Sequence, residues 1–189
     1  AGYDVLSLAG ASSASLNNVT LDHVGGINMN STGTLAFTGT NDLDTAVVTM
    51  TSGSASITGR TTGSFALAGG SGLTIGGVDS GELIGQVDFH GGTLFIANLG
   101  DSSGLLLNTG IGGNGTVSIA DGQKLALEAD SLTGSGTLTV TGQGALTVNG
   151  TQSAFSSNVN YGAGTLTLGA NNALGTGMLT LTNDTTDMI

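Results

Sequence analysis

Cysteine and cationic side chains are what this sequence lacks most clearly. With no cysteine, the chain has no disulfides, zinc–thiolate sites or thiol nucleophiles. Arg60 and Lys124 are its only two Lys or Arg residues against 13 acidic ones, and the formal net charge is −11. Two cations cannot neutralise a run of phosphates, so we expect no nucleic-acid partner and no docking on an anionic membrane surface.

Proline is also absent, and aromatic residues make up 4% of the chain and charged residues 8%. The hydrophobic fraction of 38% is too high for a disordered chain, and 35 glycines supply turns. No segment has the 3.6-residue apolar period of a helix or the apolar length of a membrane span. We therefore predict an all-β protein. No signal peptide is recognised, so we expect a secreted form to be one piece of a longer precursor.

One short phrase recurs in residues 134–181. It reads GSGTLTVTG, GALTVNG, GAGTLTLG and GTGMLTLTN, so that each copy has a glycine-rich turn followed by aliphatic residues at alternate positions. Alternation with a period of two is typical of a strand with one buried face. Copies at a fixed spacing indicate a stacked repeat rather than a globular domain.

Two series of aliphatic pairs extend this repeat, and successive pairs in each lie about 21 residues apart. The first series is Leu73/Ile75, Leu94/Ile96, Val117/Ile119, Leu138/Val140, Val159/Tyr161 and Leu179/Leu181. The second series is Phe65/Leu67, Val87/Phe89, Leu105/Leu107, Leu125/Leu127, Leu146/Val148 and Leu166/Leu168. A coil of that length is typical of one rung of a parallel β-helix, with the pairs stacked inside it. The sequence therefore predicts a β-solenoid with about 21 residues per rung.

No linker, charge block or change in composition divides the chain, so we predict one domain over residues 1–189. Residues 63–181 hold the regular rungs. Residues 1–60 contain strand-like pairs, such as Leu6/Leu8 and Val48/Met50, that follow the period less strictly.

Residues 162–184, GAGTLTLGANNALGTGMLTLTND, carry a more specific pattern. They resemble the autotransporter-associated β-strand repeat of Gram-negative passenger domains, in which G-T-L-x-L-x-x-x-N-x-L-G-x-G-x-L-x-L recurs. The residues on this pattern are Thr165, Leu166, Leu168, Asn172, Leu174, Gly175, Gly177, Leu179 and Leu181. The resemblance implies a right-handed parallel β-helix, exported by type V secretion through an outer-membrane barrel that lies C-terminal to it. In that family the segment next to the barrel is often an autochaperone.

Two enzymatic alternatives have some support in the sequence. GDSSG at 100–104 is close to the GDSGG around the serine of trypsin-like proteases, with His23 and His90 as candidate bases. Asp, Ser and Gly are also the ordinary residues of a turn, which is the interpretation we prefer. Polysaccharide lyases on β-helices use an Arg or Lys base beside acidic residues, and no acidic cluster accompanies Arg60 or Lys124 in the sequence.

Two binding alternatives are weaker. The loops at 69–75 and 112–119 resemble calcium-binding nonapeptide repeats but lack the aspartate ligand. Outward T-x-T pairs such as Thr137/Thr139 are a feature of ice-binding faces. When Thr137/Thr139 is aligned with Thr116/Ser118 and Asn158/Asn160, no flat threonine array results. We interpret these threonines as a solvated strand face.

We therefore expect no catalytic residue, metal or cofactor. The function that we expect is a segment of a bacterial surface passenger that acts as an adhesin or a self-associating stalk. Its expected location is the extracellular face of the cell surface, and its expected partners are its own outer-membrane barrel, further copies, and host surface proteins or glycans. The alternative function is a barrel-proximal autochaperone, and a β-helix enzyme is the third.

Overall fold

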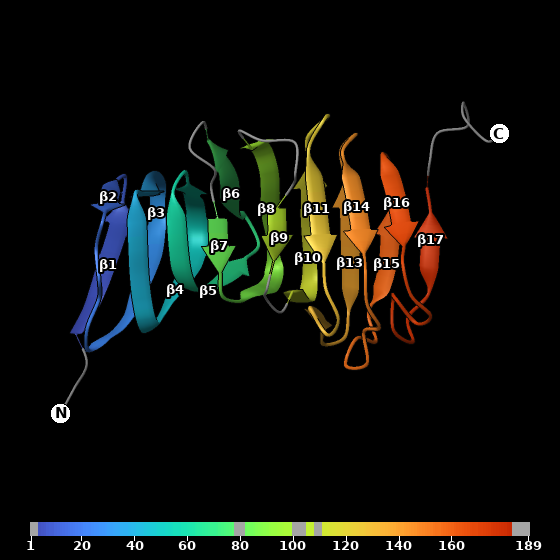
Figure 1. Ribbon diagram of the computed structural model, residues 1–189. Coiled ribbons are helices and arrows are strands. Elements are labelled where there is room, and N and C mark those ends of the chain that lie inside the picture. Colours follow the sequence, from blue (N-terminus) through green and yellow to red (C-terminus); the bar gives the residue numbers. More distant parts are fainter. Residues whose placement is uncertain (1–3, 78–81, 100–104, 108–110, 183–189) are drawn as a thin grey trace.

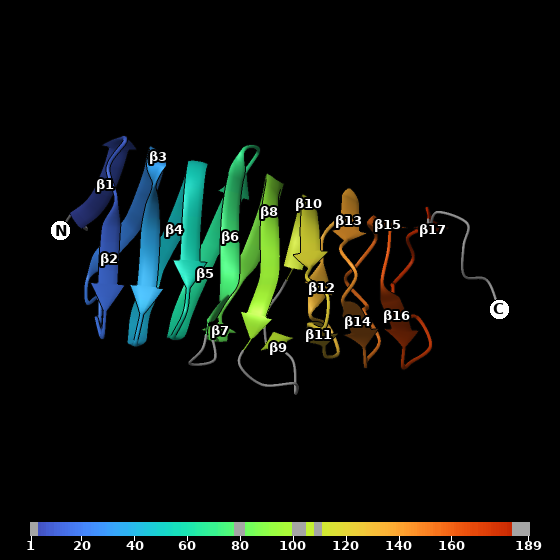
Figure 2. The same ribbon diagram turned by 90° about the horizontal axis from the view of Figure 1, so that it is seen from above.

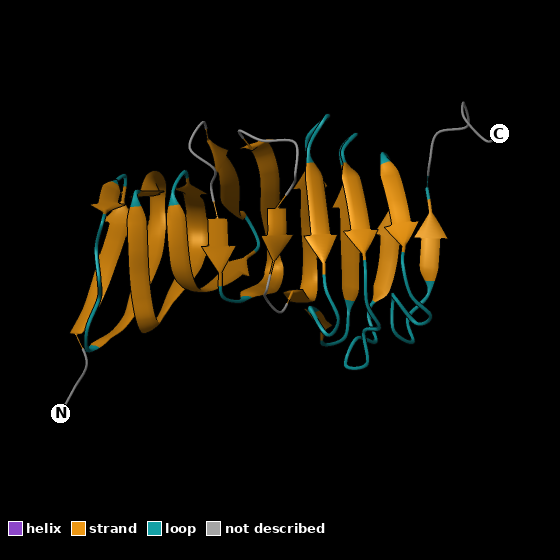
Figure 3. Ribbon diagram, viewed as in Figure 1, coloured by secondary structure: helices purple, strands orange, loops and turns teal. Residues whose placement is uncertain are grey.

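The computed structural model describes residues 4–77, 82–99, 105–107 and 111–182. In these ranges the regular structure is β-strand alone, and neighbouring strands pair in parallel. Figures 1 and 3 show the coils stacked side by side into an elongated body with β1 and β17 at opposite ends. The prediction of an all-β parallel solenoid with about 21 residues per coil is confirmed.

Thirteen of the described strands form one sheet and four form another. The larger sheet contains β1 (Asp4–Gly10), β2 (Ala14–Asn17), β3 (Val24–Thr38), β4 (Thr40–Ile57), β5 (Arg60–Ala68), β6 (Ser71–Gly77), β7 (Glu82–Ile84), β8 (Val87–Leu99), β10 (Ile111–Ile119), β12 (Leu132–Thr133), β13 (Thr137–Thr141), β15 (Asn158–Tyr161) and β17 (Leu179–Leu181). The smaller sheet contains β9 (Leu105–Leu107), β11 (Lys124–Leu127), β14 (Ala145–Val148) and β16 (Thr165–Leu168).

Each coil has three faces, because the long strands turn corners. The first face consists of β1 and the pairing segments at 26–30, 47–50, 64–68, 87–91 and 111–114. The second face consists of β2, β6, β13, β15 and β17 with the last parts of β3, β4, β8 and β10. The third face begins with residues 40–42, 60–62 and β7, and Figure 1 shows it continuing into β9, β11, β14 and β16. Figure 2 shows the coils from above.

The second predicted series was wrong at one step, where it joined residues of two different faces. Its first step is confirmed, since Phe65 pairs with Val87 and Leu67 with Phe89. Val87 on the first face pairs with Ile111, not with Leu105. Leu105 instead pairs with Leu125, and that third-face series continues through Leu146 to Leu166 as predicted. The step from Val87 to Leu105 is 18 residues, the shortest in the series, and this short step marks the jump between faces.

The first predicted series lies on the second face and is confirmed, apart from one register shift. Leu138 pairs with Val159 and Val159 with Leu179, as predicted. Val117, however, pairs with Val140 instead of Leu138. The shift lies between Thr133 and Leu138, which are two residues farther apart than their partners Gly112 and Gly115. Beside it, the Asn114 side-chain oxygen accepts a hydrogen bond of 2.7 Å from the Thr137 amide.

The inward residues form one continuous hydrophobic core along the stack. Phe37 and Phe65 meet edge to face, with ring centroids 5.5 Å apart and an interplanar angle of 80°. Farther along, Gly115 makes room for the Phe89 ring, since a Cβ there would lie 2.3 Å from it. Both contacts join different faces across the interior, because Phe37 and Gly115 lie on the second face and Phe65 and Phe89 on the first. Packing of this kind along the stack is how a solenoid gains stability.

Polar side chains occupy a few inward positions and bond the backbone of adjacent coils. The amide oxygen of buried Asn41 accepts a hydrogen bond from the Val19 backbone, and its nitrogen donates to the Thr38 carbonyl at 2.9 Å. Gln152 is fully buried. It accepts a hydrogen bond from the Leu132 amide and donates one to the Glu128 carbonyl of the preceding coil. These amides replace strand hydrogen bonds at the corners, where the ladder is interrupted.

Candidate functional site

One column of small polar residues runs along the outer surface of the second face. Register pairs connect it without a break through Thr34, Ser54, Gly72, Thr93, Thr116, Thr139, Asn160 and Thr180. We call these eight residues the threonine column. Strands in a sheet lie about 4.8 Å apart. Six of the eight residues carry a hydroxyl group at this spacing, and Gly72 and Asn160 do not. Within the described structure, one hydrogen bond joins side chains of the column, between the hydroxyls of Thr34 and Ser54, 3.4 Å apart.

The register shift at β10 is what completes the column. The period of about 21 residues predicts that Thr116 pairs with Thr137, an alignment in which the outward threonines form no flat array. In the structure Thr116 pairs with Thr139, and Thr139 pairs with Asn160. The alignment of Thr116 with Thr137 was therefore wrong.

A second column of small residues lies beside the first. It runs through Ser15, Ala36, Ser56, Thr74, Phe95, Ser118 and Thr141. Phe95 is its one large side chain, 40% exposed, and its ring lies across Gly72 of the neighbouring coil, where a Cβ would be 3.0 Å from it. The surface is thus a polar strip of small side chains that carries one exposed aromatic ring.

The second face also differs from the other two in charge. None of its described strand segments contains an acidic, basic or histidine residue. The first face carries exposed Asp88, and the third face carries exposed Asp42 and half-exposed Glu82. In a protein with a formal charge of −11, this face is where a like-charged surface meets the least local repulsion.

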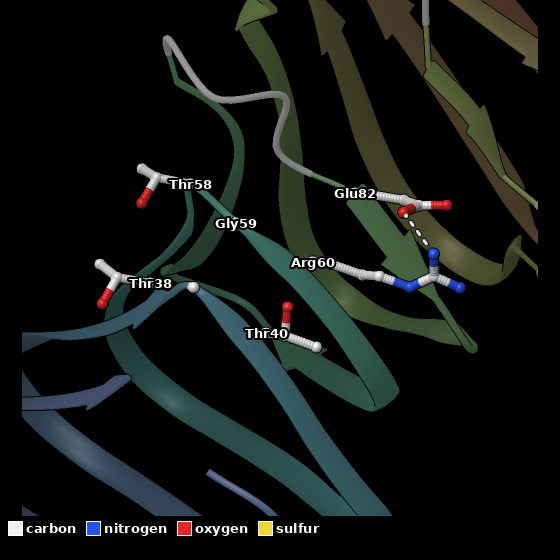
Figure 4. Close-up of a pocket in the computed structure, with 7 residues that line it drawn as sticks. Thr38, Thr40, Thr58, Gly59, Arg60 and Glu82 are labelled. Atoms are coloured by element: carbon white, nitrogen blue, oxygen red, sulfur yellow. Dashed lines mark ion pairs between the residues drawn. The ribbon is translucent and has the colours of Figure 1, made fainter. Parts of the chain in front are cut away.

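A polar groove of about 540 Å³ lies at a corner between the second and third faces. Its lining comes from three successive coils and consists of Thr38, Gly39, Thr40, Thr58, Gly59, Arg60 and Glu82. We call it the Arg60 groove. Figure 4 shows Thr38 and Thr58 on one side of Gly59 and the Arg60–Glu82 pair on the other.

The sequence shows no acidic cluster beside Arg60, and the structure brings a single acidic residue next to it. Glu82 lies one coil away in register with Arg60, with 3.5 Å between a guanidinium nitrogen and a carboxylate oxygen. The spacing of 22 residues is one coil, so the period itself could have identified the pair. Lys124 opens β11 in the other sheet and lines a separate, smaller groove of about 240 Å³.

The histidines proposed as protease bases lie on different coils. His23 contacts its neighbour Asp22, and both side chains are about 80% exposed. His90 lies exposed on β8, in register with Asn114. The GDSSG motif at 100–104 lies outside the described residues. The described part of the chain holds no group of three or more His, Cys, Asp or Glu arranged as a metal site.

Within the described part of the chain, two ionisable groups have shifted pKa values. Hydrogen bonds from the hydroxyl and backbone amide of Ser153, one coil away, lower the pKa of the Asp130 carboxylate. Burial raises the pKa of the Tyr161 phenol, which points into the core. Asp130 bonds a turn and Tyr161 fills the interior, so both shifts have structural causes.

Comparison with protein-family models, curated proteins and solved structures gave no match. Within the described ranges there is also no helix with the length and apolar character needed to cross a bilayer.

Proposed function

We propose that this chain is a segment of a bacterial surface passenger that acts as an adhesin or self-associating stalk, with the threonine column as its contact surface. The observation that carries the proposal is the combination of a column of small, mostly hydroxyl-bearing residues with a face free of charge, in a strongly acidic protein. The resemblance of residues 162–184 to passenger repeats supports the placement at the cell surface, next to an outer-membrane barrel.

The chemistry of the column favours a second copy of the chain as its partner. A threonine hydroxyl both donates and accepts a hydrogen bond, so a threonine column is complementary to itself. A single such bond contributes about 0.5–1.5 kcal/mol, but bonds repeated along a rigid rod act together once the first has formed. Phe95 adds an aromatic anchor of the kind that dominates many interfaces.

Introducing negative charge into the column tests the proposal. Thr116 and Thr139 are register partners on the second face, and Thr147 and Thr167 are register partners on the third. We expect beads coated with the protein to aggregate, the double variant Thr116→Asp/Thr139→Asp to disperse, and the matched double variant Thr147→Asp/Thr167→Asp to aggregate like the parent protein.

The same variants separate self-association from adhesion to a host. Binding of coated beads to host cells and matrix proteins is measured alongside aggregation. Loss of either activity in the second-face variant alone supports the column as the adhesive surface. If the parent protein neither aggregates nor binds, or if both double variants behave alike, the proposal is wrong.

A folding role is the second candidate, favoured by the β16–β17 end of the stack. Leu168, Met178 and Leu181 are 46%, 63% and 65% exposed there, next to strand edges that can pair with a further parallel coil. Such an edge would act as a template for neighbouring coils, as an autochaperone does. Deleting this segment from a longer passenger would then impair export and folding, and unchanged surface levels would argue against it.

A further inference from the structure

From the Arg60 groove we infer that the protein has a binding site for a neutral saccharide, recognised through paired hydroxyl groups. Arg60 and Glu82 lie in register with Thr40, so three different side chains stand in one column across three coils. The site is separate from the threonine column, and its volume of about 540 Å³ falls within the range of small-molecule sites.

Two stacked glycines keep the middle of the groove open. Gly59 packs directly on Gly39, and a Cβ at Gly59 would lie 2.1 Å from the Gly39 carbonyl oxygen. Gly39 itself has a φ of +66°, a conformation that disfavours other residues. The floor of the groove is therefore bare backbone, with side chains only along its two sides, as Figure 4 shows.

The two sides offer the groups that a sugar needs. The Arg60–Glu82 pair is loose at 3.5 Å and half exposed, so most of the guanidinium donors and carboxylate lone pairs face solvent. A donor beside an acceptor matches two adjacent hydroxyls of a pyranose ring, one accepting and one donating. On the other side, no hydrogen bond in the described part of the chain uses the hydroxyls of Thr38 or Thr58.

The charge around the groove favours a neutral ligand over an anionic one. Glu82 already opposes the single cation of the site, and Asp42 lies exposed in the adjacent column, in register with Thr62. An incoming carboxylate or phosphate would compete with Glu82 and approach a protein of formal charge −11. None of the described lining residues has an aromatic ring for stacking, so we expect affinity in the millimolar range for one sugar unit.

The test is a titration of isotope-labelled protein with the methyl glycosides of glucose, galactose and mannose, followed by amide chemical shifts. We expect saturable shifts at Thr40, Gly59 and Arg60 with at least one of these sugars. Arg60→Ala should weaken that binding tenfold or more. Lys124→Ala, which removes the other cation at the equivalent start of a third-face strand, should leave it unchanged.

Two further measurements keep the result decisive. Thr58→Val preserves shape while removing one hydroxyl, and should weaken binding severalfold whether or not Arg60→Ala folds. Glucuronate serves as the anionic probe and should bind more weakly than the neutral glycosides. The inference is overturned if no glycoside gives saturable shifts, if the groove variants bind like the parent, or if glucuronate binds more tightly. Bead aggregation through the threonine column is a separate readout, so the two proposals fail independently.

Discussion

Replacing the buried Gln152 by leucine should destabilise the coil more than any surface change of the same type. Its side chain is fully buried and accepts a hydrogen bond of 2.8 Å from the Leu132 amide. Its nitrogen donates to the carbonyls of Glu128 at 2.7 Å and Gly150 at 3.2 Å. Leucine has a similar volume, so Gln152→Leu isolates the polar contribution from that of a cavity.

The magnitude follows from the groups that lose their partner. The Leu132 amide and the Glu128 carbonyl would each lose a buried partner, at about 1–3 kcal/mol per unsatisfied group. Part of that cost is offset because leucine is easier to bury than an amide, which leaves about 2–4 kcal/mol. For a chain of this size such a loss lowers Tm by roughly 5–15 °C.

Thermal and urea unfolding measure the change, with Gln143→Leu as the matched control. Gln143 is exposed in the turn before β14, so its replacement should stay within about 0.5 kcal/mol of the parent protein. Hydrogen exchange adds a local readout, since the Leu132 amide should exchange faster in Gln152→Leu. A cost below about 1 kcal/mol, with the Leu132 amide still protected, would show that Gln152 does not hold the two coils together.

Three further predictions concern single side chains. The buried Thr61 hydroxyl has no hydrogen-bond partner among the described residues, so Thr61→Val should stabilise the protein by about 1 kcal/mol, and a loss of stability in urea unfolding would contradict this. Because burial raises the pKa of Tyr161, stability should hold below its unfolded value near 10 and fall as the pH rises above it. Tyr161→Phe should lessen this alkaline decline, and an unchanged decline would count against this cause. Ser153 lowers the pKa of Asp130, so the Asp130 carboxylate stabilises the folded protein above the ordinary pKa of 3.8. This stabilisation is lost as the pH falls through the pKa of the folded state. Asp130→Ala should therefore show a smaller acid-induced drop in Tm than the parent.

The period of the coil could be predicted from sequence, whereas the number of faces could not. Aliphatic pairs mark a face only where the inward residues are aliphatic. In the first coils, the third face buries Asn41, Thr61 and Gly63 at inward positions, which hides it from an aliphatic pattern. Beyond β10, the first face buries Gln152 in the same way. The aliphatic pairs of the first face in the early coils and those of the third face in the later coils therefore looked like one series.

The threonine column and the Arg60 groove could be predicted from the sequence only in part. Outward threonines could be recognised from their alternation with core residues, but the column depends on the shift between β10 and β13. That shift arises because Thr133 and Leu138 are two residues farther apart than their partners Gly112 and Gly115, and a fixed period does not predict such an insertion. The Arg60–Glu82 pair lay at one period and was missed because the third face had not been identified in that region.

The absence of cysteine allows a direct test of the central claim, that two copies associate through the threonine column. Thr139→Cys places the only thiol on the second face, and Thr147→Cys places it on the third as a control with similar exposure. On aggregated beads under mild oxidation, the account predicts disulfide-linked dimers with Thr139→Cys at a much higher rate than with Thr147→Cys. Equal rates, or faster cross-linking through Thr147→Cys, would contradict it.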